Sequence, residues 1–313
     1  MHYAAPSWLP GGHLQTIFPA TLIRKPRLDF RRERWNSPDG DFIDVDFVDG
    51  RPGQPFLVLF HGLEGSSASH YARALMSHIA ALGWSGAVPH FRGCSGELNH
   101  APRFYHSGDA AEVDWIVRRL AAGRERPFYA AGVSLGGNAL LRWLGESGQQ
   151  AGIVDAACAI SAPLDLAGGG AALSRGFNKI YTRLFLQTLK PKCLQKLKQF
   201  PGLFDADRML RARNLYEFDN VVTAPLHGYR DTDDYWHRAS ARHVLNDIAV
   251  RTLVLNAKND PFLPAHHLPQ SASSQVTLDY PDHGGHVGFA AGGIPGRIDW
   301  LPSRIVRFLT EGH

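Results

Sequence analysis

A single serine lies between two glycines in the segment Gly132-Val133-Ser134-Leu135-Gly136, and this segment could carry nucleophilic chemistry. Residues 127–131 before it are mainly apolar and are typical of a buried strand, while residues 137–144 after it resemble a helix. At such a strand-to-helix turn, small neighbours let the backbone turn tightly around the serine. The hydroxyl is then held clear of the backbone beside the positive end of a helix. We therefore predict that Ser134 attacks an electrophilic carbon.

A nucleophilic serine needs a base that takes its proton and an acid that orients the base. Asp260 directly follows an apolar strand, 126 residues after Ser134, where an orienting carboxylate is expected. His286 lies 26 residues beyond Asp260, in a glycine-rich loop that could fold back over the serine. His283 stands three residues earlier, and the sequence barely separates the two histidines. We choose His286 because it lies deeper in the glycine-rich loop and precedes an apolar stretch that can anchor it.

Attack on a carbonyl also needs donors for the negative charge that develops on its oxygen, and backbone N–H groups are fixed dipoles suited to this. The N–H of Leu135, the residue after the nucleophile, is one expected donor. The other is expected in residues 61–65, after the strand that ends at Phe60. By position we choose Leu63, with His61 and Gly62 turning the backbone.

The histidines raise the alternative of a metal site. His283 and His286 are three residues apart, and His266 and His267 are adjacent. No acidic or cysteine ligand accompanies them at a recognised spacing. We therefore expect no metal and no cofactor.

Strand and helix patterns alternate along most of the chain, which predicts an α/β fold with a mainly parallel central sheet covered by helices on both faces. Residues 41–48 alternate loosely and are predicted as a half-exposed strand near a sheet edge. The further predicted strands are 56–60, 84–89, 127–131, 156–160, 251–256 and 275–280, and the predicted helices are 69–82, 113–120, 137–144 and 302–309.

The alternation stops at Pro163, and residues 163–249 look helical without a clear strand. We interpret them as a helical lid inserted at the carboxyl edge of the sheet, with residues 1–162 and 250–313 forming the core. The lid is basic, since residues 174–213 hold ten lysines and arginines and two aspartates, giving +8 against −4 for the rest of the chain. Two interpretations stay open: a solvated helical face, or weak contact with an anionic membrane surface.

The composition suits one large domain with an insertion, since the chain has 313 residues, of which 44% are hydrophobic. No run of apolar residues is long enough to span a bilayer, and residues 1–6 lack the form of a signal peptide. Three widely spaced cysteines, Cys94, Cys158 and Cys193, fit no disulfide framework. We therefore expect a cytoplasmic protein, and we expect no nucleic-acid partner.

Several segments together resemble the α/β-hydrolase superfamily and, within it, the YheT-like hydrolases. They span residues 8 to 289 and form a specific combination: Trp8-Leu9-Pro10-Gly11-Gly12-His13-Leu14-Gln15-Thr16, His61-Gly62-Leu63-Glu64-Gly65-Ser66-Ser67, Phe91-Arg92-Gly93-Cys94-Ser95-Gly96, Gly132-Val133-Ser134-Leu135-Gly136-Gly137-Asn138 and Gly284-Gly285-His286-Val287-Gly288-Phe289. The resemblance implies a serine hydrolase with Ser134, Asp260 and His286 as a catalytic triad. It also implies esterase activity on short- or medium-chain acyl esters, with eukaryotic relatives active on lipids and fatty-acid ethyl esters.

Two questions stay open from the sequence. Residues 11–13 either lie near the site or brace the core, or else they are turn residues beside a packed Trp8 and Leu14. For the function, the leading hypothesis is a serine esterase that acts on a small acyl ester through an acyl-enzyme. The alternatives are a lipase or acyltransferase at a membrane surface, and a non-catalytic binder of hydrophobic ligands on the same fold.

Overall fold

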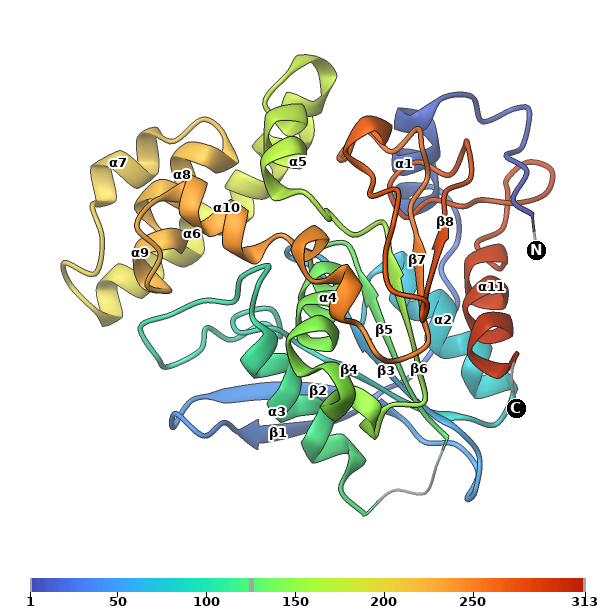
Figure 1. Ribbon diagram of the computed structural model, residues 1–313. Helices are drawn as coiled ribbons and strands as arrows, with labels where there is room; N and C mark the ends of the chain where they lie inside the picture. The colour runs from blue at the N-terminus through green and yellow to red at the C-terminus, as the bar shows by residue number, and fades with distance from the viewer. Residues whose placement is uncertain (1, 124–126, 312–313) are drawn as a thin grey trace.

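The computed structural model describes residues 2–123 and 127–311, and its centre is an eight-stranded sheet (Figure 1). The strands are β1 (Arg31–Asn36), β2 (Phe42–Val48), β3 (Phe56–Phe60), β4 (Ser85–Pro89), β5 (Phe128–Val133), β6 (Ala156–Ile160), β7 (Thr252–Leu255) and β8 (Val276–Asp279). Their order across the sheet is β1-β2-β4-β3-β5-β6-β7-β8. The pairs from β4 to β8 are parallel, which confirms the predicted fold class.

Helices cover both faces of the parallel strands, and each face has its own apolar core. On β3, Phe56, Val58 and Phe60 point to one face, while Leu57 and Leu59 point to the other. The first face packs against α3 (Ala110–Ala121) and α4 (Leu135–Ser147), and the second against α2 (His70–Ala81) and α11 (Trp300–Thr310). A parallel strand buried on both faces usually has apolar side chains throughout. The continuous apolar runs in the sequence therefore identified these strands correctly.

The first two strands differ from the prediction. Residues 42–48 were expected to be half exposed, yet every residue of β2 is buried. The reason is β1, which the sequence analysis did not identify and which forms the edge of the sheet beside β2. Arg32 and Arg34 of β1 lie opposite Asp46 and Asp44 of β2 and make paired hydrogen bonds to their carboxylates at 2.6–3.0 Å. A strand made largely of charged residues is stabilised here by cross-strand ion pairs.

Between β6 and β7 the chain forms helices and no strand, as expected for residues 163–249. They are α5 (Leu166–Leu173), α6 (Lys179–Gln199), α7 (Ala206–Arg211), α8 (Leu215–Val221), α9 (Thr223–Leu226) and α10 (Thr232–Ala239), with short 3-10 helices between α5 and α6 and after α10. Figure 1 shows them to one side of the sheet. They enclose a small apolar cluster of their own that includes Leu186, Met209 and Phe218. The division into a core and a helical lid stays a prediction.

No helix in residues 2–123 or 127–311 is both long and apolar enough to cross a membrane. Even α6, at 21 residues, carries six lysines and arginines.

Candidate active site

Ser134 occupies a strained turn between β5 and α4. Its backbone angles are φ 53° and ψ −122°, in the region that side chains rarely adopt, and its N–H donates to the carbonyl of Ile160 at 2.8 Å. The flanking glycines are required by space. A Cβ at position 132 would lie 2.5 Å from the carbonyl oxygen of Gly136, and a Cβ at 136 would lie 2.4 Å from that of His61. The strand-to-helix turn inferred from the sequence is therefore present, with Ser134 directly before the first turn of α4.

The structure brings Ser134, Asp260 and His286 together through hydrogen bonds. Nε2 of His286 lies 3.0 Å from Oγ of Ser134, and Nδ1 of His286 lies 2.9 Å from Oδ2 of Asp260. Because a carboxylate accepts, the bond to Asp260 assigns the ring proton to Nδ1 and leaves Nε2 free to accept from the serine hydroxyl. This is the arrangement in which a serine can lose its proton as it attacks.

His283 does not reach the serine. Its side chain is exposed, and the polar contact recorded for it is with the amide of Asn259, whose Nδ2 lies 3.4 Å from His283 Nδ1. Of the two histidines that the sequence could barely separate, His286 is the one whose ring meets both Ser134 and Asp260.

Two further contacts fix the acid and the imidazole. The N–H of Phe262 donates to Oδ1 of Asp260 at 2.8 Å, so both carboxylate oxygens are engaged. The ring of Phe262 stacks on the imidazole of His286, with centroids 4.0 Å apart and planes 16° apart. Since a stacked imidazole has little rotational freedom, the ring stays aligned with its two hydrogen-bonding partners.

The N-terminal helix α1 (Gly12–Thr21) holds the loop that carries His286. Oγ1 of Thr16 accepts from the N–H of His286 at 2.8 Å. Oε1 of Gln15 accepts from the N–H of Gly284 at 2.8 Å and from the amide of Asn259 at 2.9 Å. A Cβ on Gly12 would lie 1.9 Å from the carbonyl oxygen of Asn259, so only glycine allows this approach.

For the question left open on residues 11–13, the approach of Gly12 to Asn259 places the segment beside the site, while the hydrogen bonds that hold the loop come from Gln15 and Thr16; Leu14, expected as packed in the alternative, is 49% exposed. The roles of Gln15, Thr16 and Phe262 were not found from the sequence. Residues 8–16 resemble the family, and this resemblance was the signal that could have drawn attention to Gln15 and Thr16. It did not indicate which residues they contact.

The predicted oxyanion donors, Leu63 and Leu135, both line the pocket in front of Ser134. In the loop after β3, the N–H of Gly62 donates to Tyr71 and the N–H of Glu64 donates to Tyr105, at 2.8 and 2.7 Å. In the parts of the chain that the structure describes, no acceptor is recorded for the N–H of Leu63, which lies between them. The N–H of Leu135 begins α4, where the first turn has no intrahelical acceptor.

His61 holds the start of the loop after β3 in place through two hydrogen bonds of its ring. It is fully buried, and burial lowers its pKa to about 3, so the ring is neutral. Its Nε2 accepts from the N–H of Phe91 at 3.0 Å, and its Nδ1 donates to the carbonyl of Gly62 at 2.8 Å. The buried imidazole therefore ties the end of β3 to the loop after β4, and with it the backbone next to Leu63.

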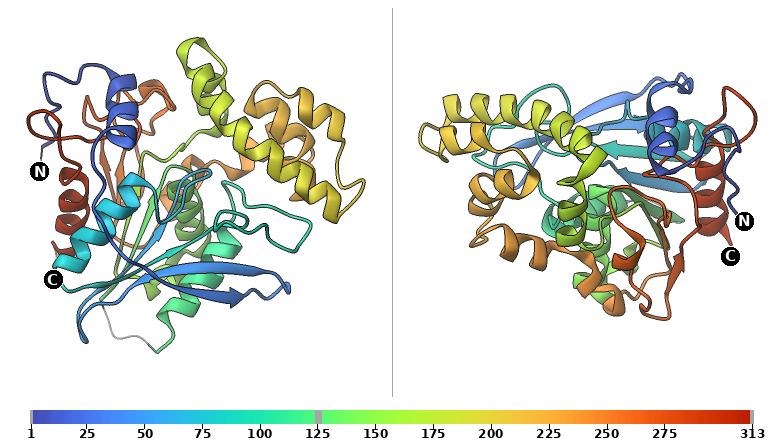
Figure 2. Two further views of the ribbon diagram at one scale, coloured as in Figure 1. Left: turned by 180° about the vertical axis from the view of Figure 1, so that it is seen from behind. Right: turned by 90° about the horizontal axis from the view of Figure 1, so that it is seen from above.

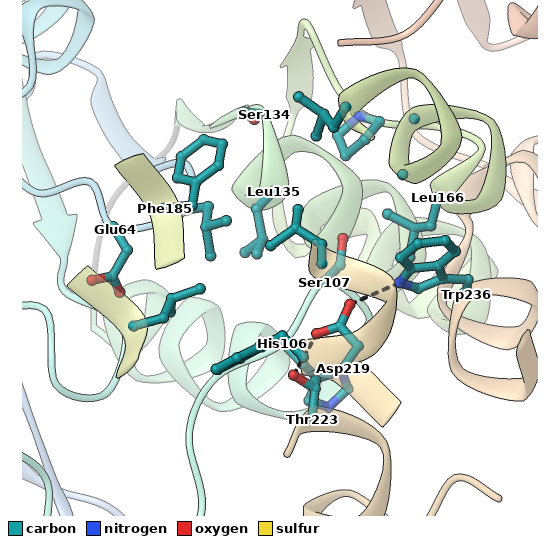
Figure 3. Close-up of a pocket in the computed structure, with 18 of the residues that line it drawn as sticks. Glu64, His106, Ser107, Ser134, Leu135, Leu166, Phe185, Asp219, Thr223 and Trp236 are labelled. Atoms are coloured by element: carbon teal, nitrogen blue, oxygen red, sulfur yellow. Dashed lines mark hydrogen bonds between the residues drawn. The ribbon is translucent and has the colours of Figure 1, made fainter. Parts of the chain in front are cut away.

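Ser134 and His286 open onto a cavity of about 140 Å³ whose wall is mainly apolar (Figure 3). Five helices of the predicted lid contribute to it, α5, α6, α8, α9 and α10, with α9 contributing Thr223. Their apolar lining side chains include Leu166, Leu173, Phe185, Leu189, Phe218, Val222 and Trp236. Such a wall suits a hydrocarbon group placed beside the nucleophile.

Two acidic side chains interrupt the apolar wall. Asp219 of α8 accepts from Thr223 at 2.6 Å and from the indole of Trp236 at 2.8 Å, and its burial raises the pKa of this carboxyl to about 6 (Figure 3). Glu64, beside Leu63, forms an ion pair with Lys192 of α6 at 2.7 Å. This ion pair links the helical segment to the loop that carries a predicted oxyanion donor.

The fold and this site together define the class of protein. The family model described as "alpha/beta hydrolase fold" matches residues 55–292, and the chain belongs to this family. The chain is 41% identical over 309 residues to the Escherichia coli (strain K12) protein named "Putative esterase YheT", covering 95% of this chain and 90% of that one. It is also 29% identical over 316 residues to mouse "Phospholipase ABHD3", covering 96% and 77% of the two chains.

Solved structures agree with the fold. An esterase from Exiguobacterium antarcticum superposes with a TM-score of 0.57 at 17% identity, covering 89% of this chain and 99% of that one. The esterase Pf2001 from Pyrococcus furiosus gives a TM-score of 0.55 at 16% identity, covering 92% and 98%. At these identities the likeness shows the shared architecture, and the chemistry has to be argued from the site.

Proposed function

We propose that this protein is a serine esterase that hydrolyses carboxylic esters of short- to medium-chain acyl groups. The observation that carries the proposal is the unbroken hydrogen-bond chain from Asp260 through His286 to Ser134, the last two of which line an apolar pocket. The relative named as a putative esterase, at 41% identity, supports the same reaction class. The cysteine pattern supports the cytoplasm as its compartment.

In the first half-reaction, Oγ of Ser134 attacks the ester carbonyl while Nε2 of His286 takes the hydroxyl proton. Asp260 stabilises the imidazolium that forms, and the N–H groups of Leu63 and Leu135 stabilise the negative oxygen. A single donor of this kind lowers the barrier by roughly 3–4 kcal/mol. The tetrahedral intermediate then collapses, and the leaving alkoxide receives the proton from His286, which leaves an acyl group on Ser134.

In the second half-reaction, His286 takes a proton from water, and the resulting hydroxide attacks the acyl-serine carbonyl. Collapse of this intermediate returns the proton to Oγ of Ser134 and releases the carboxylic acid. The apolar wall formed by α5, α6, α8 and α10 would hold the acyl chain during both steps. Removing water from around that chain favours binding by about 0.8 kcal/mol for each buried methylene group.

The test is the hydrolysis of p-nitrophenyl esters with acyl chains from two to twelve carbons. We expect Ser134→Ala to abolish turnover of p-nitrophenyl butyrate, and labelling by a fluorophosphonate probe to occur in the wild-type protein and not in the variant. Circular dichroism of the variant controls for folding. Unchanged turnover in folded Ser134→Ala protein would refute the mechanism. A wild-type protein that neither turns over esters nor reacts with the probe would instead support a binding role for the same pocket.

A further inference from the structure

Helix α6 presents different surfaces on its two sides. On the inner side, Phe185, Leu189, Lys192 and Cys193 line the pocket. The opposite side is uncovered, and the view from behind in Figure 2 shows the helix along the outside of the helical segment. We call the exposed residues on this side the outer stripe: Phe177, which lies just before the helix, and Lys179, Ile180, Arg183, Leu184, Gln187, Thr188, Pro191, Leu194, Gln195, Lys198 and Gln199.

Large apolar side chains are concentrated on the outer stripe. Phe177, Ile180, Leu184 and Leu194 are 50%, 48%, 55% and 39% exposed. Ten large hydrophobic side chains are exposed in the described parts of the chain, and these four fall within 18 consecutive residues. Single exposed hydrophobic residues are ordinary, but a row on one helix face marks an interaction surface.

The charges of the outer stripe all have one sign. Lys179, Arg183 and Lys198 are exposed, and the stripe holds no aspartate or glutamate. Among residues 2–123 and 127–311, no ion pair is recorded for any of the three. A helix face that is only solvated commonly mixes acids and bases four residues apart, which stabilises the helix. The pattern here instead fits a partner that is negatively charged.

The combination of cations and large apolar side chains narrows the class of partner. A nucleic acid offers phosphates, but a groove lined by phosphates would leave Ile180 and Leu184 without an apolar environment. An anionic phospholipid bilayer supplies both, because headgroups pair with the cations while the acyl boundary receives the apolar side chains. The helix, about 31 Å long at 1.5 Å per residue, can lie flat against such a plane.

We propose that the outer stripe of α6 docks this protein reversibly on anionic phospholipid membranes. The proposal goes beyond ester hydrolysis, since the stripe shares no residue with the pocket or with Ser134, Asp260 and His286. Its consequence for the site is spatial. Because the inner side of the same helix lines the pocket, docking would bring the pocket wall close to the plane in which acyl lipids are held.

The test is co-sedimentation of the whole protein with phosphatidylcholine vesicles, with and without phosphatidylglycerol, at low and at high salt. We expect binding to vesicles that contain phosphatidylglycerol at low salt, and weaker binding at high salt because exposed charges are screened. The triple variant Lys179→Gln/Arg183→Gln/Lys198→Gln should bind at least roughly tenfold more weakly, since each cation near an anionic surface contributes severalfold in affinity.

A matched control removes the same charge elsewhere. Arg24, Lys25 and Arg27 are exposed and lie outside the helical segment, so Arg24→Gln/Lys25→Gln/Arg27→Gln should bind like the wild type. For the apolar part, Ile180→Ser/Leu184→Ser should weaken binding, while Leu22→Ser/Leu82→Ser, at positions of similar exposure, should not.

The outcomes also separate this proposal from the esterase mechanism. Folded stripe variants should keep wild-type turnover of water-soluble p-nitrophenyl butyrate, and Ser134→Ala protein should bind vesicles as the wild type does. Binding that is insensitive to salt and to lipid charge would overturn the proposal, and so would equal losses in the stripe and control variants. Failure to bind any vesicle would overturn it too and would point to another anionic partner.

Discussion

The hydroxyl of Thr16 offers a sharp test of how the histidine is positioned. This side chain is largely buried, and its Oγ1 accepts from the N–H of His286 at 2.8 Å and donates to the carbonyl of Gly12 at 2.7 Å. Thr16→Val keeps the shape and removes both bonds, whereas Thr16→Ser keeps the hydroxyl and removes a methyl group. The pair therefore separates hydrogen bonding from packing.

The expected size of the effect follows from the N–H that valine would leave without a partner. A buried donor that loses its acceptor costs about 1–3 kcal/mol. If the loop must return to its original position for His286 to reach Ser134, this cost enters the barrier. At 1.36 kcal/mol for each factor of ten, kcat should fall by roughly 5- to 150-fold. KM should change little, because Thr16 does not line the pocket.

The assay is steady-state hydrolysis of p-nitrophenyl butyrate by both variants, well below their melting temperatures, with the folded fraction measured alongside. We expect Thr16→Ser to keep most of the wild-type kcat and Thr16→Val to lose it. Wild-type kcat in folded Thr16→Val protein would refute the positioning argument. Equal losses in the two variants would show that packing, and not the hydrogen bond to His286, is what matters.

Two further predictions concern stability. Gly136→Ala should lower the free energy of unfolding, measured by denaturant titration, by about 1–3 kcal/mol or more, because the added Cβ would lie 2.4 Å from the carbonyl oxygen of His61. The control Gly293→Ala, with no atom within 4 Å of the added Cβ, should change the free energy of unfolding very little. Asp219→Asn tests the raised pKa of that carboxyl. Because folding disfavours its ionised form, the unfolding free energy of the wild type should fall relative to that of the variant by up to about 3 kcal/mol as pH rises from about 4 through 6. A difference in unfolding free energy that does not change with pH would contradict this.

The sequence was informative where chemistry follows the ends of strands. Ser134, Asp260 and His286 each come just after a predicted strand, and parallel strands place such positions at one edge of the sheet. Two further features were predictable from short segments of sequence. The small residues around Ser134 allow its positive φ, and continuous apolar runs indicate strands buried on both faces. These features depend on neighbours along the chain, so a single sequence displays them.

The features that were missed depend on contacts between separate elements of the fold. Strand β1 is mostly charged, and it becomes a strand because Arg32 and Arg34 find Asp46 and Asp44 across the sheet. That pairing also covers the edge of β2, so residues predicted to be half exposed are buried. An alternating pattern gives no sign of which polar residues will be matched by a neighbouring strand.

The choice of His286 over His283 rested on weak evidence in the sequence for the same reason. His283 and His286 have similar surroundings in the sequence, and it is the N–H of His286, not that of His283, that meets Thr16, 270 residues earlier. A contact across that distance leaves no local trace in the glycine-rich loop.

The brace formed by α1 has a practical consequence for work on this protein. The segment recognised by the family model starts at residue 55, whereas Gln15 and Thr16 hold the histidine loop near the opposite end of the chain. Trimming the chain to the recognised segment would keep all three members of the hydrogen-bond chain and discard the support that orients one of them.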